Sequence, residues 1–247
     1  MQFNIKDYKE KSCNFLYQNK YLLFTAIFLI IFCVLPLLSV PTIKGHDLMF
    51  HLQRIEALAK EMKIGNIFPH IYTMLLDGNG YAAPMFYGQV FLLIPAALIN
   101  YCGLSVMQAY NIFIVLLVSA TAFSMYFCTF SITKSRNASF CGAIMFTLSS
   151  YMGADLFYRS ALGEIQSFVF IPIVFAGFYN ILYADINKWY LLPLGMVGML
   201  HCHTLSSVIT VFSLILFLVF SIARSILLTL FSPYPTPPYI QNLPLNR

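Results

Sequence analysis

Charged residues are scarce in this 247-residue sequence, and their scarcity excludes an ordinary soluble protein. Aspartate, glutamate, lysine and arginine fill 9% of the positions, hydrophobic residues fill 60%, and the mean hydropathy is +0.77. Soluble domains carry about a quarter charged residues. The net charge of +5 is not gathered into a basic cluster interleaved with aromatic residues, which excludes nucleic acid as a partner. The composition therefore predicts an all-α protein of membrane-spanning helices.

Three further signals are missing. The six cysteines form no CxxC pair, so the sequence predicts neither a disulfide framework nor a zinc finger. No small-residue cleavage site follows the first apolar run, so this run is expected to remain as a span rather than a signal peptide. No internal repeat is visible, so the sequence gives no support to the inverted-repeat architecture of many transporters.

The apolar runs predict a multi-pass protein of the cell membrane. Residues 1–20 carry four lysines and are expected in the cytoplasm under the positive-inside rule. A single transmembrane module is expected over 21–224, followed by an irregular Pro-rich tail at 225–247. Six spans are expected, at residues 21–40, 108–132, 138–152, 166–184, 189–200 and 206–223.

The side on which each later loop lies depends on residues 86–101, which are short and interrupted by Gly88, Gln89 and Pro95. If they do not cross, nine of the fourteen lysines and arginines lie inside and five outside; if they cross, the count inverts. The charge bias favours a re-entrant or surface-lying segment within an external loop at 41–106. This topology places all the candidate site residues on the extracytoplasmic side.

An amphipathic helix is predicted at 46–63, lying on the membrane surface. Its apolar stripe recurs at helical spacing, and the polar residues Gln53, Glu56, Lys60 and Lys63 fall opposite. Asp47, His51 and Arg54 form a flank, expected at the boundary between lipid and water. The apolar stripe consists of Leu48, Leu52, Ile55, Ala59 and Met62.

Four groups of residues could carry chemistry. Asp47 with His51 could act as a general base or hold a metal, or Asp47 could simply complement the helix dipole. Arg159 could grip a phosphate while Asp155 and Glu164, in the predicted loop 151–164, orient a sugar or a metal; the alternative is an interfacial ion pair.

The other two groups are weaker candidates. His201 and His203 do not share a helical face, so they favour contact with water or a ligand over metal binding. Asp77-Gly-Asn-Gly predicts a turn, after which Tyr81 and Tyr87 could stack on a sugar or lie at headgroup level.

The order of these features resembles the GT-C superfamily of membrane glycosyltransferases, which use polyprenyl-phosphate-linked sugars. The matching parts are a first span, Gly45-His46-Asp47 with His51 and Arg54, and the segment 158–164 after further spans. It also resembles a group of bacterial membrane proteins, some labelled as related to 6-pyruvoyl-tetrahydropterin synthase, although nothing here resembles the soluble zinc enzyme. The chain is shorter than usual for GT-C enzymes, as a truncated, fragmentary or minimal relative would be.

The resemblance implies sugar transfer at the extracytoplasmic face. It implies a catalytic acid at Asp47 and a second acid, near the donor phosphate, at Asp155 or Glu164. From the residue pattern we further expect a catalytic role for His51, binding of the donor phosphate by Arg159 and Arg54, and a divalent cation, Mg²⁺ or Mn²⁺, with Asp47 and Asp155 as candidate ligands. The expected partners are membrane lipids and the polyprenyl-phosphate sugar. The competing hypothesis is a non-enzymatic membrane protein, acting as a transporter, lipid-handling protein or assembly subunit. The residues assigned to orienting the substrate are Asp155, Glu164, His201, His203, Tyr81 and Tyr87.

Overall fold

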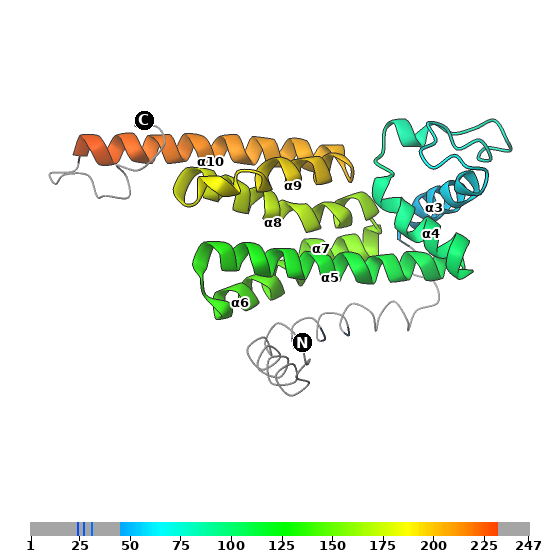
Figure 1. Cartoon of the computed structure of the whole chain (residues 1–247), viewed down its shortest axis with the longest axis horizontal. Coiled ribbons are helices and arrows are strands. Elements are labelled where there is room, and N and C mark those ends of the chain that lie inside the picture. Colours follow the sequence, from blue (N-terminus) through cyan, green and yellow to red (C-terminus); the bar gives the residue numbers. More distant parts are fainter. Residues whose placement is uncertain (1–23, 25–26, 28–30, 32–44, 232–247) are drawn as a thin grey trace, which may run out of the picture.

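The computed structural model describes residues 45–231 together with residues 24, 27 and 31 (Figure 1). The predicted lead-in and most of the first predicted span therefore lie outside the described residues. Regular structure in the described part is helical, with one isolated β-bridge between Tyr72 and Tyr81. The predicted all-α class is confirmed.

Four helical stretches of the described chain are long and apolar enough to cross a membrane. They are α5 (Val106–Thr133), the run Arg136–Arg159, α8 (Leu162–Tyr183) and α10 (Thr204–Phe231). The run Arg136–Arg159 contains α6 (Arg136–Thr147), α7 (Ser150–Ala154) and the π-helix η3 (Asp155–Arg159). The structure thus shows a protein with four membrane-compatible helices and does not confirm a count of six.

Two of the predicted elements are too short to cross. The predicted span at 189–200 contains α9, Leu191–Leu200, which has only ten residues, about half the length needed for a bilayer. The apolar piece Val90–Cys102, formed by η2 (Val90–Leu92) and α4 (Leu93–Cys102), is also shorter than a span. The short length of Val90–Cys102 agrees with the prediction that residues 86–101 do not cross the membrane.

Serine side chains begin several of these helices. Ser105 forms a capping box with Gln108 at the start of α5, and the hydroxyls of Ser135 and Ser149 accept backbone N–H groups at the starts of α6 and α7. Such caps pair N–H groups that the helix cannot pair itself. The cap at Ser149 marks the point at which the second membrane-compatible run is interrupted.

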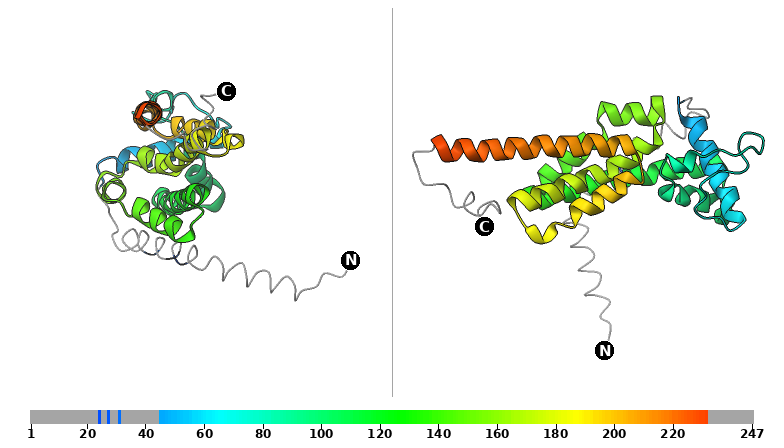
Figure 2. Two further views of the ribbon diagram at one scale, coloured as in Figure 1. Left: turned by 90° about the vertical axis from the view of Figure 1, so that its left-hand side faces the viewer. Right: turned by 90° about the horizontal axis from the view of Figure 1, so that it is seen from above.

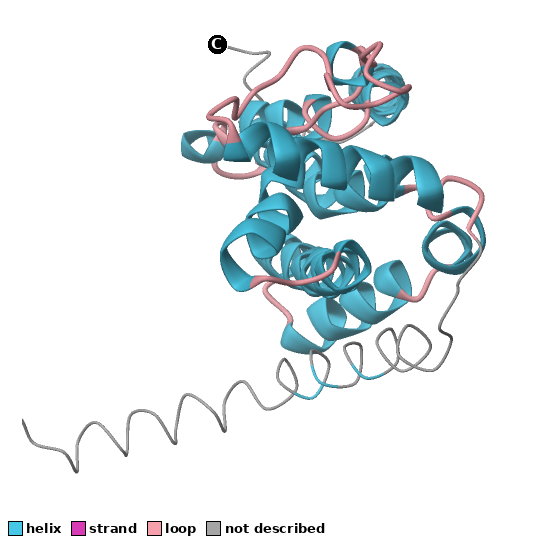
Figure 3. Ribbon diagram, turned by 90° about the vertical axis from the view of Figure 1, so that its right-hand side faces the viewer, coloured by secondary structure: helices cyan, strands magenta, loops and turns pink. Residues whose placement is uncertain are grey.

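The helices α5, α8 and α10 lie alongside one another, and α3 (Leu48–Lys63) crosses one end of this bundle (Figures 1 and 2). α5 packs against α6 and α8, and α8 packs against α9. The α5–α6 and α8–α9 connections lie at the opposite end from α3 (Figure 1). The bundle therefore has one end that carries α3 and its neighbouring loops, and Figure 3 looks directly at that end.

The main apolar core lies at the α3 end. Ile55 and Leu58 of α3 are fully buried and belong to one cluster with Phe113 of α5 and Ile165 of α8. Burying such a side chain contributes about 1.5–3 kcal/mol. This core fixes α3 firmly on the bundle, next to the start of α8.

The flank of α3 differs from its prediction. Gln53, Glu56, Lys60 and Lys63 are exposed as expected, but His51 and Arg54 are 4% and 3% exposed rather than at a boundary. The reason is that the chain around Tyr87 and Gly88 folds back over this flank, where Arg54 donates a hydrogen bond of 2.8 Å to the carbonyl of Gly88. The sequence periodicity of α3 alone could not predict that a distant segment buries this flank.

Two other segments are more helical than predicted. Residues 151–159, expected within a loop, continue the helix as α7 and η3, and the chain turns only at Ser160, which has a φ of 54°. The tail expected to be irregular from 225 begins with the last turns of α10, which ends at Phe231. Residues 232–247 lie outside the described residues.

Glu61 of α3 holds the following loop through hydrogen bonds, which leads to a testable prediction about stability. Its buried carboxylate accepts hydrogen bonds from the backbone N–H and hydroxyl of Thr73, at 2.8 and 2.6 Å, and from Asn66 at 3.0 Å. These bonds lower the pKa of Glu61 against the opposing effect of burial. Glu61→Ala should lower the free energy of unfolding by roughly 2–4 kcal/mol and expose the following loop to proteolysis.

Glu56→Ala is the matched control, since Glu56 lies on the same helix and makes only an exposed ion pair with Lys60. This control should change the free energy of unfolding by less than about 1 kcal/mol. Equal thermal shifts for the two variants would contradict the assignment.

Candidate functional site

Backbone contacts join the start of α3 to the end of η3. The N–H of Asp47 donates to the carbonyl of Arg159 at 2.9 Å, and the N–H of His46 donates to the carbonyl of Tyr158 at 3.3 Å. The rings of His46 and Tyr158 also meet edge to face. A Cβ at Gly45 would overlap the side chain of Ser160, so only glycine permits this approach. The structure therefore brings Asp47 and Arg159 together at one end of the bundle.

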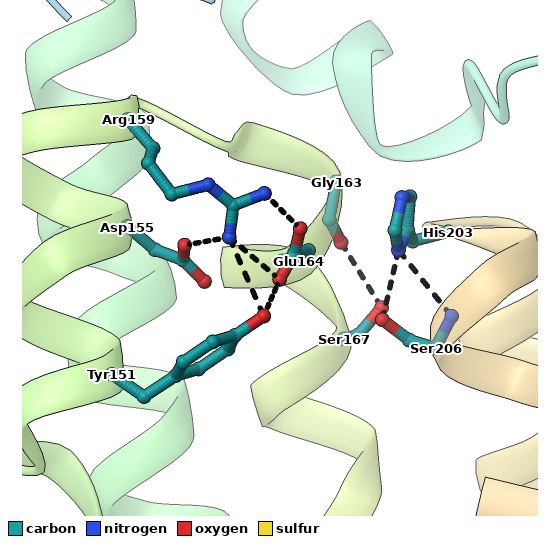
Figure 4. Close-up of polar contacts among 8 residues, drawn as sticks. All are labelled: Tyr151, Asp155, Arg159, Gly163, Glu164, Ser167, His203 and Ser206. Carbon is teal, nitrogen blue, oxygen red and sulfur yellow. Dashed lines mark hydrogen bonds and ion pairs between the residues drawn. The ribbon is translucent and has the colours of Figure 1, made fainter. Parts of the chain in front are cut away.

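Arg159 is the centre of a polar network (Figure 4). Its Nη1 lies 2.7 Å from Oδ1 of Asp155, and its Nη2 lies 2.6 Å from Oε1 of Glu164. Tyr151 donates a short hydrogen bond to Glu164 and accepts one from Nη1 at 3.4 Å. Asp155 is fully buried, and its Oδ2 has no hydrogen-bond partner among the residues that the structure describes.

The local helical structure explains this network. Tyr151, Asp155 and Arg159 follow one another at intervals of four along α7 and η3, so their side chains share a face. Glu164 lies in the first turn of α8, where a carboxylate is favoured by the helix dipole. π-helical turns of this kind occur often at functional sites.

The guanidinium of Arg159 retains free donors. Nη1 donates to Tyr151, Asp155 and Glu164, and Nη2 donates one hydrogen bond to Glu164. The Nε–H group and the second N–H of Nη2 have no partner among the described residues. The side chain is 37% exposed. These donors could bind an oxygen atom of a ligand while the two carboxylates hold the guanidinium in place.

His203 lies at the start of α10, beside this network. Its Nδ1 accepts the backbone N–H of Ser206 at 3.4 Å and lies 2.8 Å from the Ser206 hydroxyl. An accepting Nδ1 places the proton of the neutral ring on Nε2, which points away from Ser206 in Figure 4. Burial lowers the pKa of His203, with Glu164 opposing and Arg159 adding to that effect. His203 is therefore a neutral donor at neutral pH.

His201 and His203 have separate environments, as their spacing predicts. His201 is exposed, whereas its backbone carbonyl lies so close to Gly88 that a Cβ there would overlap it. This contact joins the segment after α3 to the connection between α9 and α10. Four segments that are distant in sequence, at 45–47, 87–89, 159–164 and 201–206, therefore meet at the same end of the bundle.

The remaining predicted site residues lie in or near α3. The guanidinium of Arg54 lies over the rings of Phe50 and Tyr87, with its carbon 5.4 and 5.1 Å from their centroids. Tyr81 is exposed and pairs with Tyr72 through backbone hydrogen bonds. The structure thus gives Arg54 partners among the described residues that do not belong to the network around Arg159. The predicted turn at Asp77-Gly-Asn-Gly is confirmed, with Asp77 and both glycines at positive φ.

The candidate metal ligands do not fit a shared ion. Asp47 is exposed, whereas Asp155 is buried with Oδ1 bound to the positive charge of Arg159. Within the described part of the chain, no three histidine, cysteine, aspartate or glutamate side chains are grouped to hold a metal.

Three contributors were missed by sequence analysis: Tyr151, Ser160 and Gly88. The interval of four between Tyr151 and Asp155 would have identified the tyrosine if the segment had been read as a helix. Ser160 and Gly88 gave no signal, because each matters through a contact with a distant segment.

His51 leads to a predicted pH dependence of stability. Burial is the main cause that lowers its pKa from 6.5 to about 3, and the charges of Arg54 and His203 add to it. Between these values the unfolded chain binds more protons than the folded protein, so the free energy of unfolding should fall as the pH falls from about 6.5. The slope for one such group approaches about 1.4 kcal/mol per pH unit.

Thermal unfolding of the wild type and of His51→Gln between pH 7 and pH 5 checks this prediction. The variant should show a smaller loss of stability on acidification. The difference between the two slopes isolates His51, since the lowered pKa of His203 acts in the same direction in both proteins. Glu61 does not interfere, because its lowered pKa affects stability only below about 4.5. Identical slopes in both proteins would contradict the prediction.

Comparison with known proteins identifies one uncharacterised relative. Over 187 residues, 73% of this chain, the sequence is 22% identical to an uncharacterised protein of Lactococcus lactis subsp. cremoris (strain MG1363). The match covers 30% of that protein, so this chain corresponds to less than a third of its length. No protein-family model and no solved structure matches the sequence.

Proposed function

We propose that this protein transfers a sugar from a polyprenyl-phosphate donor at the extracytoplasmic face of the membrane, as a glycosyltransferase of the GT-C kind. The observation that carries the proposal is the 2.9 Å hydrogen bond between the N–H of Asp47 and the carbonyl of Arg159. It joins the backbone of Asp47, whose side chain is exposed, to the backbone of Arg159, whose side chain is partly exposed, at one end of a bundle with membrane-compatible helices.

The proposed reaction is an inverting displacement. Asp47 takes the proton of the acceptor hydroxyl, whose oxygen forms a bond to the anomeric carbon of the sugar. The bond between that carbon and the phosphate oxygen breaks, and its electron pair leaves with the lipid phosphate. The free N–H groups of Arg159 donate to the departing phosphate, and the neutral His203 donates to a sugar hydroxyl.

The carboxylates of Asp155 and Glu164 neutralise the positive charge with which Arg159 could attract a phosphate. One guanidinium facing two ionised carboxylates has no excess positive charge, so phosphate would be recognised by directed N–H groups rather than by net charge. The benefit of the arrangement is a guanidinium already held in position before the substrate binds.

The pairing of Arg159 with Asp155 and Glu164 supports a second candidate function. A guanidinium paired with two carboxylates is also the expected structure of an ion-pair network that only holds α7 and α8 together. In that case the protein would be a transporter, a lipid-handling protein or an assembly subunit without covalent chemistry.

Asp47→Asn tests the proposal. The side chain makes no capping hydrogen bond, so the variant should fold normally while losing its base, and transfer should fall by about 100-fold or more. The assay is transfer of labelled sugar from a panel of polyprenyl-phosphate sugars in proteoliposomes. Glu56→Gln removes an exposed carboxylate from the same helix and should leave transfer unchanged.

Full transfer by Asp47→Asn would end the proposed mechanism. Movement of labelled lipid across the bilayer by the wild type, without any product from the panel, would favour the non-enzymatic function instead.

A further inference from the structure

The loop between α3 and α4 has its polar groups turned inward. Glu61 binds Thr73 and Asn66, and the amide of Gln89 donates to the carbonyl of Pro69 at 2.9 Å. The backbone groups of Tyr72 pair with those of Tyr81, and the Tyr72 side chain is fully buried. The polar groups that would normally face water are thus used to hold the loop together.

The outward side of the same loop is apolar. Six large hydrophobic side chains between 64 and 76 are 47–74% exposed. We call this group the apolar loop surface; it consists of Ile64, Ile67, Phe68, Ile71, Met74 and Leu76. A patch of this kind on a water-facing loop normally marks an interaction surface.

The position of the loop favours a lipid surface as its partner. α3 runs across the end of the bundle, so it lies along the plane of the membrane that the long helices cross (Figure 2). In Figure 1 the loop lies just beyond the N-terminal end of α10, where the lipid-compatible part of that helix begins. A bilayer that encloses α10 therefore ends next to this loop.

The charges beside the loop fit the same partner. Lys60 and Lys63 are exposed in the last turn of α3, directly before the apolar loop surface. Lysines at the edge of an exposed apolar surface are typical of segments that lie at the membrane interface, because they contact lipid phosphates while apolar side chains enter the acyl region.

We propose that the apolar loop surface inserts into the lipid leaflet next to α3, at the boundary between headgroups and acyl chains. The insertion fixes the orientation of α3 on the membrane. It requires no chemistry at Asp47 or Arg159, so it stands or falls independently of the proposed function.

The single tryptophan of the chain makes a direct test possible. In a Trp189→Phe background, Phe68→Trp and Met74→Trp each place a lone tryptophan on the apolar loop surface. Gln53→Trp, on the exposed polar side of α3, is the matched control. The proteins are reconstituted in nanodiscs of phosphatidylcholine and phosphatidylglycerol, with or without brominated acyl chains.

Tryptophan at 68 and at 74 should emit at shorter wavelength than at 53 and lose most of its intensity in brominated lipid. Tryptophan at 53 should instead be quenched by iodide in solution. If a folded 68 or 74 variant is quenched by iodide as strongly as the control and is insensitive to brominated lipid, the proposal is wrong and a protein partner or water covers the loop. Two positions are used so that a folding defect in one variant leaves the other to decide.

Discussion

Arg159→Ala should be among the most destabilising single substitutions in the chain, lowering the free energy of unfolding by about 3–5 kcal/mol. The substitution leaves Asp155 without its ion pair, although that carboxylate is fully buried and one of its oxygens already has no partner in the described part of the chain. Glu164 loses its partner at the same time. Thermal unfolding in detergent, followed by circular dichroism, measures the effect.

Two further variants isolate the cause. Adding Asp155→Asn to Arg159→Ala should restore part of the lost stability, because a neutral amide is less costly to bury than an unpaired carboxylate. Lys188→Ala removes the exposed, 3.8 Å pair with Asp185 and should cost less than about 1 kcal/mol. An Arg159→Ala protein as stable as Lys188→Ala would show that the network does not hold the helices.

Gly88→Ala should have the second large effect, by forcing the segment after α3 away from the α9–α10 connection. The added Cβ would overlap the backbone carbonyl of His201, which cannot move without displacing the start of α10. The same shift would weaken the hydrogen bond that Gly88 accepts from Arg54. We expect a loss of about 3 kcal/mol, at the upper end of the range for overpacking.

Gly153→Ala is the control for this prediction. Gly153 lies in α7, and a Cβ there would meet no atom within 4 Å. Since the described residues leave room for the added Cβ, alanine should be neutral or slightly stabilising at this position, because it favours the helical backbone. Similar melting temperatures for the two variants would contradict the contact between Gly88 and His201.

The elements that sequence predicted well are those specified by local pattern. The apolar period of α3 and the length of the apolar runs in α5, α8 and α10 depend on neighbouring residues only. These helices lie within a few residues of their predicted positions, except that α10 continues eight residues beyond its predicted end. The Asp77 turn was predictable for the same reason, since glycine supplies the positive φ that it needs.

The features that sequence did not predict depend on long-range contacts or on paired charges. His51 and Arg54 are buried because a segment more than thirty residues later covers them. Residues 151–159 looked like a loop because they are polar, but Asp155 and Arg159 neutralise each other one helical turn apart. The sequence predicted that Asp47 and Arg159 share one side of the membrane and one site, whereas their backbone contact could be seen only in the fold.

The most direct test of the account is labelling of single cysteines by a membrane-impermeant thiol reagent, applied from each side of the membrane. Cysteine would be placed at Asn79, Tyr158 and Lys134, all exposed, in a background without the native cysteines. Positions 79 and 158 should react from the same side, and position 134, at the other end of α5, should react from the opposite side. Reaction of 79 and 158 from opposite sides would separate Asp47 from Arg159 by a bilayer and contradict the site.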